Sequence, residues 1–144
     1  MGTVERIHVI ADHGGPPRAV EAVLADAGQG LRGDRHHGEE AGDLTLIEAE
    51  ALEQLASTSG LDLTGGQSRR NLVTRGIDLG QLVGRRFRVG EVVCEGEERC
   101  EPCQHLASLT GPPVLRGLVH TGLRASIVES GTIHVGDVVG AIDP

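Results

Sequence analysis

Two cysteines and a histidine lie close together in the segment Arg99-Cys100-Glu101-Pro102-Cys103-Gln104-His105. The two thiols are three residues apart, and the chain holds one other cysteine, Cys94. A thiolate is a nucleophile, a redox group and a soft metal ligand. The chemistry of this protein therefore depends on which of these roles the pair takes.

Three functional interpretations of the pair are open, beside the plain one of two half-buried small residues. A redox dithiol should follow a buried strand at the start of a βαβ unit, but the acidic run before Cys100 is typical of a loop. A zinc site would combine the pair with His105 and with Cys94 or a distant histidine, although no second spaced pair is present. A single working thiolate at Cys103 is favoured by Pro102, which fixes the preceding backbone, and by a helix beginning there, whose dipole stabilises the thiolate.

A second polar cluster, Gly33-Asp34-Arg35-His36-His37-Gly38, holds charged and imidazole groups between two glycines. Such groups rarely have a packing purpose, so one interpretation is an anion- or substrate-binding loop with Arg32 and Arg35 as donors. The other interpretation is a solvated loop in which Asp34 and Arg35 form a surface ion pair. The residues alone do not decide between the two.

Arginines and an asparagine at two further places are suited to an anionic ligand. In Ser68-Arg69-Arg70-Asn71, strand alternation predicts that Arg69 and Asn71 share one face. A polar strand face with a cross-strand ion pair explains the same residues. In Gly122-Leu123-Arg124-Ala125, backbone N–H groups and a guanidinium would suit a phosphate, and a plain turn is equally consistent.

The elements that must position these residues are mostly short strands, because 22 glycines separate short apolar runs without βαβ alternation. We expect one domain over residues 1–144, a mainly β fold with a closed or partly open β-barrel and a few short helices. The expected strands are residues 4–11, 43–47, 69–74, 87–89, 91–95, 125–128 and 138–142. The expected helices are 48–56, 103–109 and 114–120; 79–83 is a helical turn or short loop, 31–42 a loop, and 20–27 undecided between helix and strand.

The composition excludes several function classes. A net charge of −8 argues against general affinity for nucleic acid or anionic membranes, and Phe87 as the single aromatic residue argues against base stacking. All 13 basic residues are arginines, so a lysine Schiff base is excluded. Without a signal peptide or an apolar run of about 20 residues, we expect a cytoplasmic protein that binds neither membrane nor nucleic acid.

Five segments occur in an order that resembles the MOSC domain, which is named for the C-terminus of molybdenum cofactor sulfurases. They are Gly30-Leu31-Arg32-Gly33-Asp34-Arg35-His36-His37, Leu44-Thr45-Leu46-Ile47-Glu48-Ala49-Glu50, Arg69-Arg70-Asn71-Leu72-Val73-Thr74-Arg75-Gly76-Ile77-Asp78-Leu79, Cys100-Glu101-Pro102-Cys103 and Gly131-Thr132-Ile133-His134-Val135-Gly136-Asp137. The resemblance runs from about residue 5 to residue 141. It implies a β-barrel-like fold and binding of a molybdenum cofactor.

The resemblance also implies roles for individual residues. In family members that reduce N-hydroxylated compounds, a cysteine thiolate ligates molybdenum beside the pterin dithiolene, and the matching position is Cys103. The Arg-x-Asn element that contacts the cofactor in the family falls on Arg69 and Asn71. The glycine-aspartate-arginine-histidine loop falls on Asp34, Arg35, His36 and His37.

We therefore expect an oxo-transfer reductase of N-hydroxylated small molecules, with Cys103 as catalytic residue and molybdenum ligand. Arg32 and Arg124 complete the predicted cofactor-binding set. No cysteines remain for an iron–sulfur cluster, so we expect a separate electron-donating reductase or a cofactor-supplying protein as partner. Two alternatives stay open: a sulfur or cofactor carrier with a persulfide on Cys103, and a non-enzymatic zinc-binding module.

Overall fold

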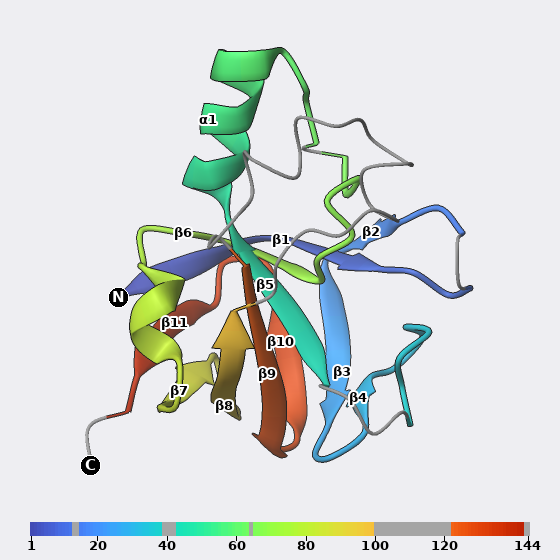
Figure 1. The fold of residues 1–144 in the computed structure, drawn as a ribbon. Coiled ribbons are helices and arrows are strands. Elements are labelled where there is room, and N and C mark those ends of the chain that lie inside the picture. The colour runs from blue at the N-terminus through green and yellow to red at the C-terminus, as the bar shows by residue number, and fades with distance from the viewer. Residues whose placement is uncertain (13–14, 39–42, 64, 100–121, 143–144) are drawn as a thin grey trace.

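The computed structural model describes residues 1–12, 15–38, 43–63, 65–99 and 122–142, and strands make up most of its regular structure (Figure 1). Its strands are β1 (Gly2–Val9), β2 (Arg18–Val20), β3 (Ala22–Asp26), β4 (Gly30–Leu31), β5 (Leu44–Glu48), β6 (Leu72–Arg75), β7 (Arg86–Val89), β8 (Val92–Arg99), β9 (Gly122–Glu129), β10 (Gly131–His134) and β11 (Val138–Ala141). Its helical segments are the α-helix α1 (Ala49–Ser59) and the 3₁₀ helix η1 (Leu79–Leu82). The prediction of a mainly β fold is confirmed.

The larger sheet closes into a barrel. Its strand order is β11-β7-β8-β9-β5-β6-β1-β2, and β11 also pairs with β1, so β2 alone lies outside the closed ring. Neighbouring strands in the larger sheet are antiparallel except β5 and β6, which are parallel and are connected through α1. A smaller sheet of order β10-β3-β4 lies beside β9, with β3 and β4 at the lower right of Figure 1.

Two apolar clusters hold this arrangement together. The larger one fills the barrel with the alternate side chains of its strands, and Phe87 and Val89 on β7 are both fully buried in it. The smaller one packs α1 against the outer side of the wall formed by β5 and β6. Ala49, Leu52 and Leu55 carry the helical period of α1 into this second cluster.

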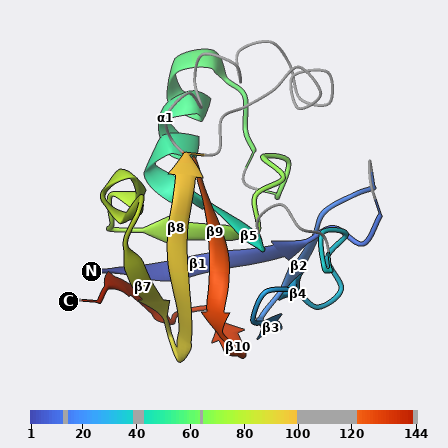
Figure 2. The same cartoon turned by 60° about the horizontal axis from the view of Figure 1, so that its bottom comes forward.

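Strand pairing shifts several element limits relative to the sequence predictions. β8 extends to Arg99 through the polar residues expected to form a loop, because it pairs with β9 along that length (Figure 2). β6 begins at Leu72, and Arg69 has a left-handed backbone with φ of 59°, so the prediction that Arg69 and Asn71 share a strand face is wrong. The undecided segment 20–27 forms a strand, β3.

Three predictions on the remaining elements also have outcomes. The predicted helix 48–56 is confirmed as α1. The predicted helices 103–109 and 114–120 lie outside the described residues. Within the described part of the chain, no helix is long and apolar enough to cross a membrane.

The close approach of β8 to the end of η1 makes a first testable prediction. A Cβ on Gly96 would overlap the carbonyl oxygen of Leu82, and the backbone of Gly96 also bonds Gly84 N at 2.8 Å and Arg85 O at 2.9 Å. Gly96→Ala should therefore lower the free energy of unfolding by about 2 kcal/mol or more, because backbone must move. Urea unfolding measures this.

Gly140→Ala is the matched control in another strand. There an added Cβ meets only side-chain atoms of Met1, which is almost fully exposed and free to move. We expect a loss below about 0.5 kcal/mol for the control. Equal losses for the two variants would contradict the packing described at Gly96.

Candidate functional site

A row of polar residues crosses five neighbouring strands of the barrel wall, and we call it the polar row. It consists of Glu98 on β8, Arg124 on β9, Thr45 on β5, Asn71 just before β6, and His8 on β1. On β5, β9 and β1, the residues on both sides of the row member belong to the barrel core, such as Leu44 and Leu46 beside Thr45. Alternation therefore directs the row to the outer side of the wall.

Asn71 of the polar row and Asp34 of the neighbouring loop are both buried, with 5% and 6% of their surface exposed. The side-chain oxygen of Asn71 accepts hydrogen bonds from Thr45 N at 3.0 Å and from the Thr45 hydroxyl at 3.2 Å. Its amide nitrogen donates to His8 O at 3.1 Å and to Asp34 Oδ1 at 3.2 Å. Asp34 Oδ1 also accepts from Ile10 N at 2.9 Å. All four hydrogen-bonding positions of the Asn71 amide are thus used within the protein.

These bonds fix the predicted binding loop against three strands. Asp34 Oδ2 accepts from His36 N at 3.3 Å, and Arg35 N donates to Ile10 O at 2.7 Å. The loop is therefore attached to the end of β1 and, through Asn71, to β5 and β6. The structure brings Asp34, Arg35, His36 and Asn71 close together, and their role in binding a cofactor stays a prediction.

Arg32 and His37 both contact Asp26 on β3, on the far side of this loop. Arg32 Nε lies 2.8 Å and His37 Nε2 lies 2.9 Å from Asp26 Oδ2. The hydrogen bond from Arg32, followed by that from His37, lowers the pKa of Asp26, and the same carboxylate raises the pKa of Arg32. Whether Arg32 and His37 contact a cofactor stays a prediction, because the contact that the structure describes for both is the half-buried carboxylate of Asp26.

Arg69 closes a turn that packs on the imidazole of His8. Arg69 N donates to Gly66 O at 2.9 Å, and Arg69 Nη1 donates to Gly15 O at 2.8 Å. Gly66 has φ of +92°, and a Cβ there would come within 2.8 Å of both His8 Cδ2 and Pro17 Cβ. The glycine is required at this position because no side chain fits between the turn and the ring.

His8 and Ser68 bring two buried polar atoms to this turn. His8 is 3% exposed and Ser68 is fully buried, yet His8 Nδ1 and Ser68 Oγ have no hydrogen-bond partner among the described residues. Burial, with a smaller contribution from Arg6, lowers the pKa of His8, so the ring is neutral near pH 7. Buried polar atoms without partners are uncommon and mark places where a ligand or water is to be expected.

Sequence reasoning missed His8, Ser68 and Thr45 as members of the site. A signal was present for His8, which interrupts the apolar run Ile7-His8-Val9-Ile10 at a position that alternation directs away from the barrel core. No comparable signal marked Thr45, whose role depends on its pairing with Asn71 from another strand.

Arg124 and the cysteines complete the account of the predicted residues. Arg124 Nη1 contacts Glu98 Oε1 at 2.8 Å at one end of the polar row. Cys100, Cys103 and His105 lie outside the described residues, so the zinc and thiolate interpretations stay predictions. Cys94 is fully buried, and burial raises the pKa of its thiol to about 12. In the described residues, no group of three or more histidine, cysteine, aspartate or glutamate side chains is placed to hold a metal ion.

The buried amide of Asn71 makes a second testable prediction. Asn71→Asp removes the donor to Asp34 and His8 O and puts a second carboxyl beside the Asp34 carboxyl. We expect the free energy of unfolding to fall by about 3 kcal/mol, because the new carboxylate oxygen would lie against the buried acceptors Asp34 Oδ1 and His8 O with no hydrogen to donate. Chemical denaturation at neutral pH measures this.

Gln67→Glu is the control for added charge, because Gln67 is exposed and lies four residues away. It should change the stability by less than about 0.5 kcal/mol. A loss at Asn71 as small as this would show that the network does not hold the loop.

The lowered pKa of His8 makes a third prediction, on pH dependence. The unfolded chain protonates this histidine near the ordinary value of 6.5, whereas the folded chain does so only at lower pH. The unfolded state therefore binds more protons below about pH 6.5, and stability falls as the pH drops toward the folded-state pKa. His8→Gln should show a smaller loss between about pH 7 and pH 5 in unfolding titrations. Parallel curves for the two proteins would contradict the assignment.

Comparisons with known proteins agree with this architecture. The family model described as the MOSC domain matches residues 33–140, which is most of the chain. No curated protein matches this chain.

Several solved structures are similar to the chain at low identity. The YuaD protein from Bacillus subtilis has a TM-score of 0.83 at 16% identity, covering 96% of this chain and 93% of that chain. YiiM from Geobacillus stearothermophilus has a TM-score of 0.78 at 16% identity, covering 99% and 76%. YiiM from Escherichia coli has a TM-score of 0.73 at 15% identity, covering 100% and 71%. At these identities the likeness shows the fold, while the family model shows the membership: this chain belongs to the MOSC domain family.

Proposed function

We propose that this protein binds a molybdenum cofactor beside the polar row and acts as an oxo-transfer reductase of N-hydroxylated small molecules. Cys103 is the proposed molybdenum ligand, and electrons come from a separate reductase. The observation that carries the proposal is the pair of buried, unpartnered polar atoms at His8 and Ser68 beside the Asn71–Asp34 network. The MOSC family membership supports the identity of the ligand.

The residues around this network fit a planar, hydrogen-bonding, anionic group. His8 Nδ1 and Ser68 Oγ offer one ring nitrogen and one hydroxyl that the described residues do not use. Gly66 carries no side chain against the His8 ring, which keeps the wall flat at this point. A pterin has ring nitrogens and carbonyl groups that would pair with such atoms.

Arg69 is the cation best suited to an anionic part of the group. Arg32 and Arg124 each contact a carboxylate, which offsets their charge, whereas the described partner of Arg69 is a backbone carbonyl. Arg69 is also the one non-glycine residue with positive φ in the described chain. Such a conformation costs about 1–3 kcal/mol and is concentrated at ligand sites, which supports a binding role for this arginine.

The thiolate would reach the site from the neighbouring strand ends. Arg99, the last residue of β8, pairs with Leu123 on β9, next to Arg124 of the polar row. Cys103 follows Arg99 by four residues in the sequence. A soft thiolate is an appropriate ligand for this metal, and hydrogen bonds around the ligand would tune it.

The residues around the polar row would then have different roles in holding the cofactor. When bound, the cofactor supplies two-electron oxygen-atom transfer chemistry. Asp34 and Asn71 act as positioning residues, because their hydrogen bonds hold the loop and the strand ends in register. Neutral His8 orients the bound ring without adding charge, and Arg69 offsets negative charge. Direct contact of Asn71, Asp34, Arg35, His36 and His37 with the cofactor stays a prediction.

Metal loading tests this proposal. Expressed in a host that makes the cofactor, the protein should retain molybdenum and yield pterin fluorescence after oxidation. Cys103→Ser should lose the metal, because the thiolate ligand is gone, while Cys100→Ser should matter less. Elemental analysis of the purified protein measures this, and absence of both metal and pterin from the wild-type protein would overturn the proposal.

Arg69→Gly separates binding from folding in the same experiment. Glycine adopts positive φ without strain, so the variant should keep or gain stability, by up to about 1 kcal/mol. It should nevertheless lose bound pterin, because the guanidinium is gone. Wild-type pterin retention by this variant would contradict the proposed role of Arg69.

A sulfur or cofactor carrier is the second candidate. Cys94 is a poor persulfide site, because it is buried and its thiol has a raised pKa. This observation favours Cys100 and Cys103 as the thiols that would carry sulfur. Incubation with a cysteine desulfurase should then add about 32 Da, one sulfur atom, at Cys103. No adduct at Cys103 would contradict the carrier function.

A further inference from the structure

Three exposed arginines lie on or next to β7. Arg86 and Arg88 alternate with Phe87 and Val89, which are fully buried in the barrel core, so both arginines are directed to the outer side of the wall. Arg85 precedes the strand and is exposed as well. The polar row crosses the barrel strands β8, β9, β5, β6 and β1, and leaves out β7 and β11. A partner on the outer face of β7 and β11 would therefore not cover the proposed cofactor site.

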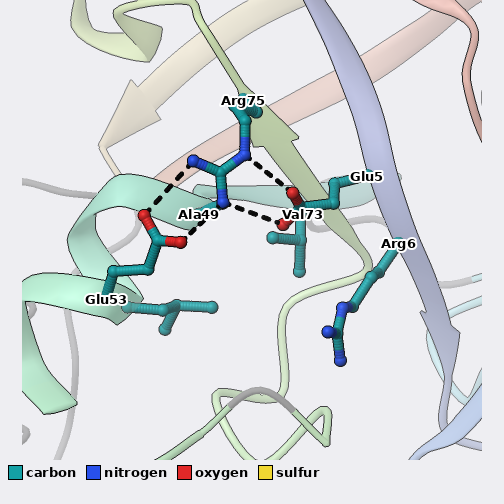
Figure 3. Close-up of a pocket in the computed structure, with 7 residues that line it drawn as sticks. Glu5, Arg6, Ala49, Glu53, Val73 and Arg75 are labelled. Atoms are coloured by element: carbon teal, nitrogen blue, oxygen red, sulfur yellow. Dashed lines mark hydrogen bonds and ion pairs between the residues drawn. The ribbon is translucent and has the colours of Figure 1, made fainter.

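Other arginines of the barrel wall are offset by carboxylates. Arg75 bonds Glu5, in the β-bulge of β1, and Glu53 on α1, each at 2.7 Å (Figure 3). Arg124 contacts Glu98 at 2.8 Å. With 21 acidic and 13 basic residues, the chain has more than enough carboxylates to pair each arginine in this way. Exposed arginines without such a partner therefore depart from the pattern of the rest of the wall.

The arginines at β7 lack this compensation. Within the described part of the chain, the side chains of Arg85 and Arg88 form no hydrogen bond or ion pair. The residues that pair with Arg88 on β8 and β11 carry no charge. Arg86 Nε lies 3.7 Å from Glu95 Oε2, beyond hydrogen-bond distance, and the two side chains are 59% and 47% exposed. An exposed pair of this kind contributes little, so three arginines and one glutamate leave the face positive.

The same face becomes apolar beyond the end of β7. Val138 on β11 is 50% exposed, and its carbonyl oxygen accepts from Gly90 N at 2.9 Å, so it lies opposite the residue that follows β7. The side chain of Met1, which is 93% exposed, lies over Gly140, the residue that pairs with Arg88. The face therefore presents two arginines at alternate positions and, two positions further on, an apolar surface.

We propose that this face binds an extended acidic segment of a partner protein, with acidic residues at two alternate positions and an apolar residue two positions beyond them. Side chains at alternate positions of an extended chain are about 6.8 Å apart on both partners, so they can meet one to one. The carboxylates would contact Arg86 and Arg88, whose paired N–H groups suit carboxylate oxygens. The apolar side chain would lie against Val138 and Met1, and Arg85 adds positive charge at the acidic end.

The surroundings favour a short acidic protein segment over other anions. The net charge of −8 repels a continuous phosphate backbone or an anionic membrane. The carboxylate of Asp137 lies against Gly90, which makes an acidic residue unfavourable at the apolar end. Both edges of β7 are already paired, with β8 and β11, so the partner contacts side chains and adds no strand. Charge complementarity of this kind decides the choice of partner more than the affinity.

Two peptides of one composition test the proposal on the full chain. Acetyl-Glu-Thr-Glu-Thr-Leu-Thr-amide has the proposed order, whereas acetyl-Thr-Glu-Glu-Thr-Thr-Leu-amide has adjacent glutamates, which an extended chain directs to opposite sides. NMR titrations should give a dissociation constant of about 1 mM or lower for the first peptide and a value about threefold or more higher for the second. The shifted amides should belong to β7 and β11. Absence of binding by the first peptide, equal affinity for both, or tighter binding of an oligothymidylate of the same length would overturn the proposal.

Three variants assign the contacts with the first peptide. Arg88→Gln should weaken its binding about fivefold, whereas Glu95→Gln should strengthen it about twofold, because it removes the carboxylate nearest Arg86. Arg18→Gln is the matched control, since it removes an exposed arginine from β2, which lies outside the closed ring. It should leave the affinity unchanged, and thermal unfolding of each variant confirms that the fold is kept. Equal losses in Arg18→Gln and Arg88→Gln, or weaker binding by Glu95→Gln, would overturn the assignment.

Discussion

The structure depends on one buried polar contact, in which the amide of Asn71 donates a hydrogen bond to the carboxylate of Asp34 at 3.2 Å. The same amide also bonds Thr45 on β5 and His8 on β1. One side chain at the start of β6 therefore joins two other strands and the loop that holds Asp34. Two nearly buried polar residues are costly unless each hydrogen-bonding position is used. That requirement fixes where the loop lies relative to the barrel wall.

The barrel supplies the rigid wall for this contact. Phe87, Leu46 and Leu123 fill its interior, and their outward neighbours, such as Thr45 and Arg124, therefore lie on the outer side. The strand register aligns the members of the polar row: Thr45 pairs with Arg124, and a shift in the pairing after Gly96 brings Glu98 opposite Arg124. A displacement of one residue in either pairing would turn the row into the core.

The sequence predicted the fold class well and the site only in part, for physical reasons. Short apolar runs between glycines are a local pattern, so the barrel class and α1 were accessible. Asp34 and Asn71 stood out as polar residues among strand and turn signals. Their contact joins residues 37 positions apart, and the turn that holds Arg69 in a left-handed conformation depends on packing against His8, so neither was accessible from local patterns. The bulge at Glu5 and the polar half of β8 were missed because strand pairing overrode local propensity.

The central claim is that a molybdenum cofactor binds beside the polar row with Cys103 as a ligand of the metal. X-ray absorption at the molybdenum edge tests it most directly, because it counts the sulfur atoms bound to the metal. The account predicts one sulfur ligand more in the wild-type protein than in a Cys103→Ser protein to which cofactor is added in excess. Equal sulfur counts in the two proteins would contradict it.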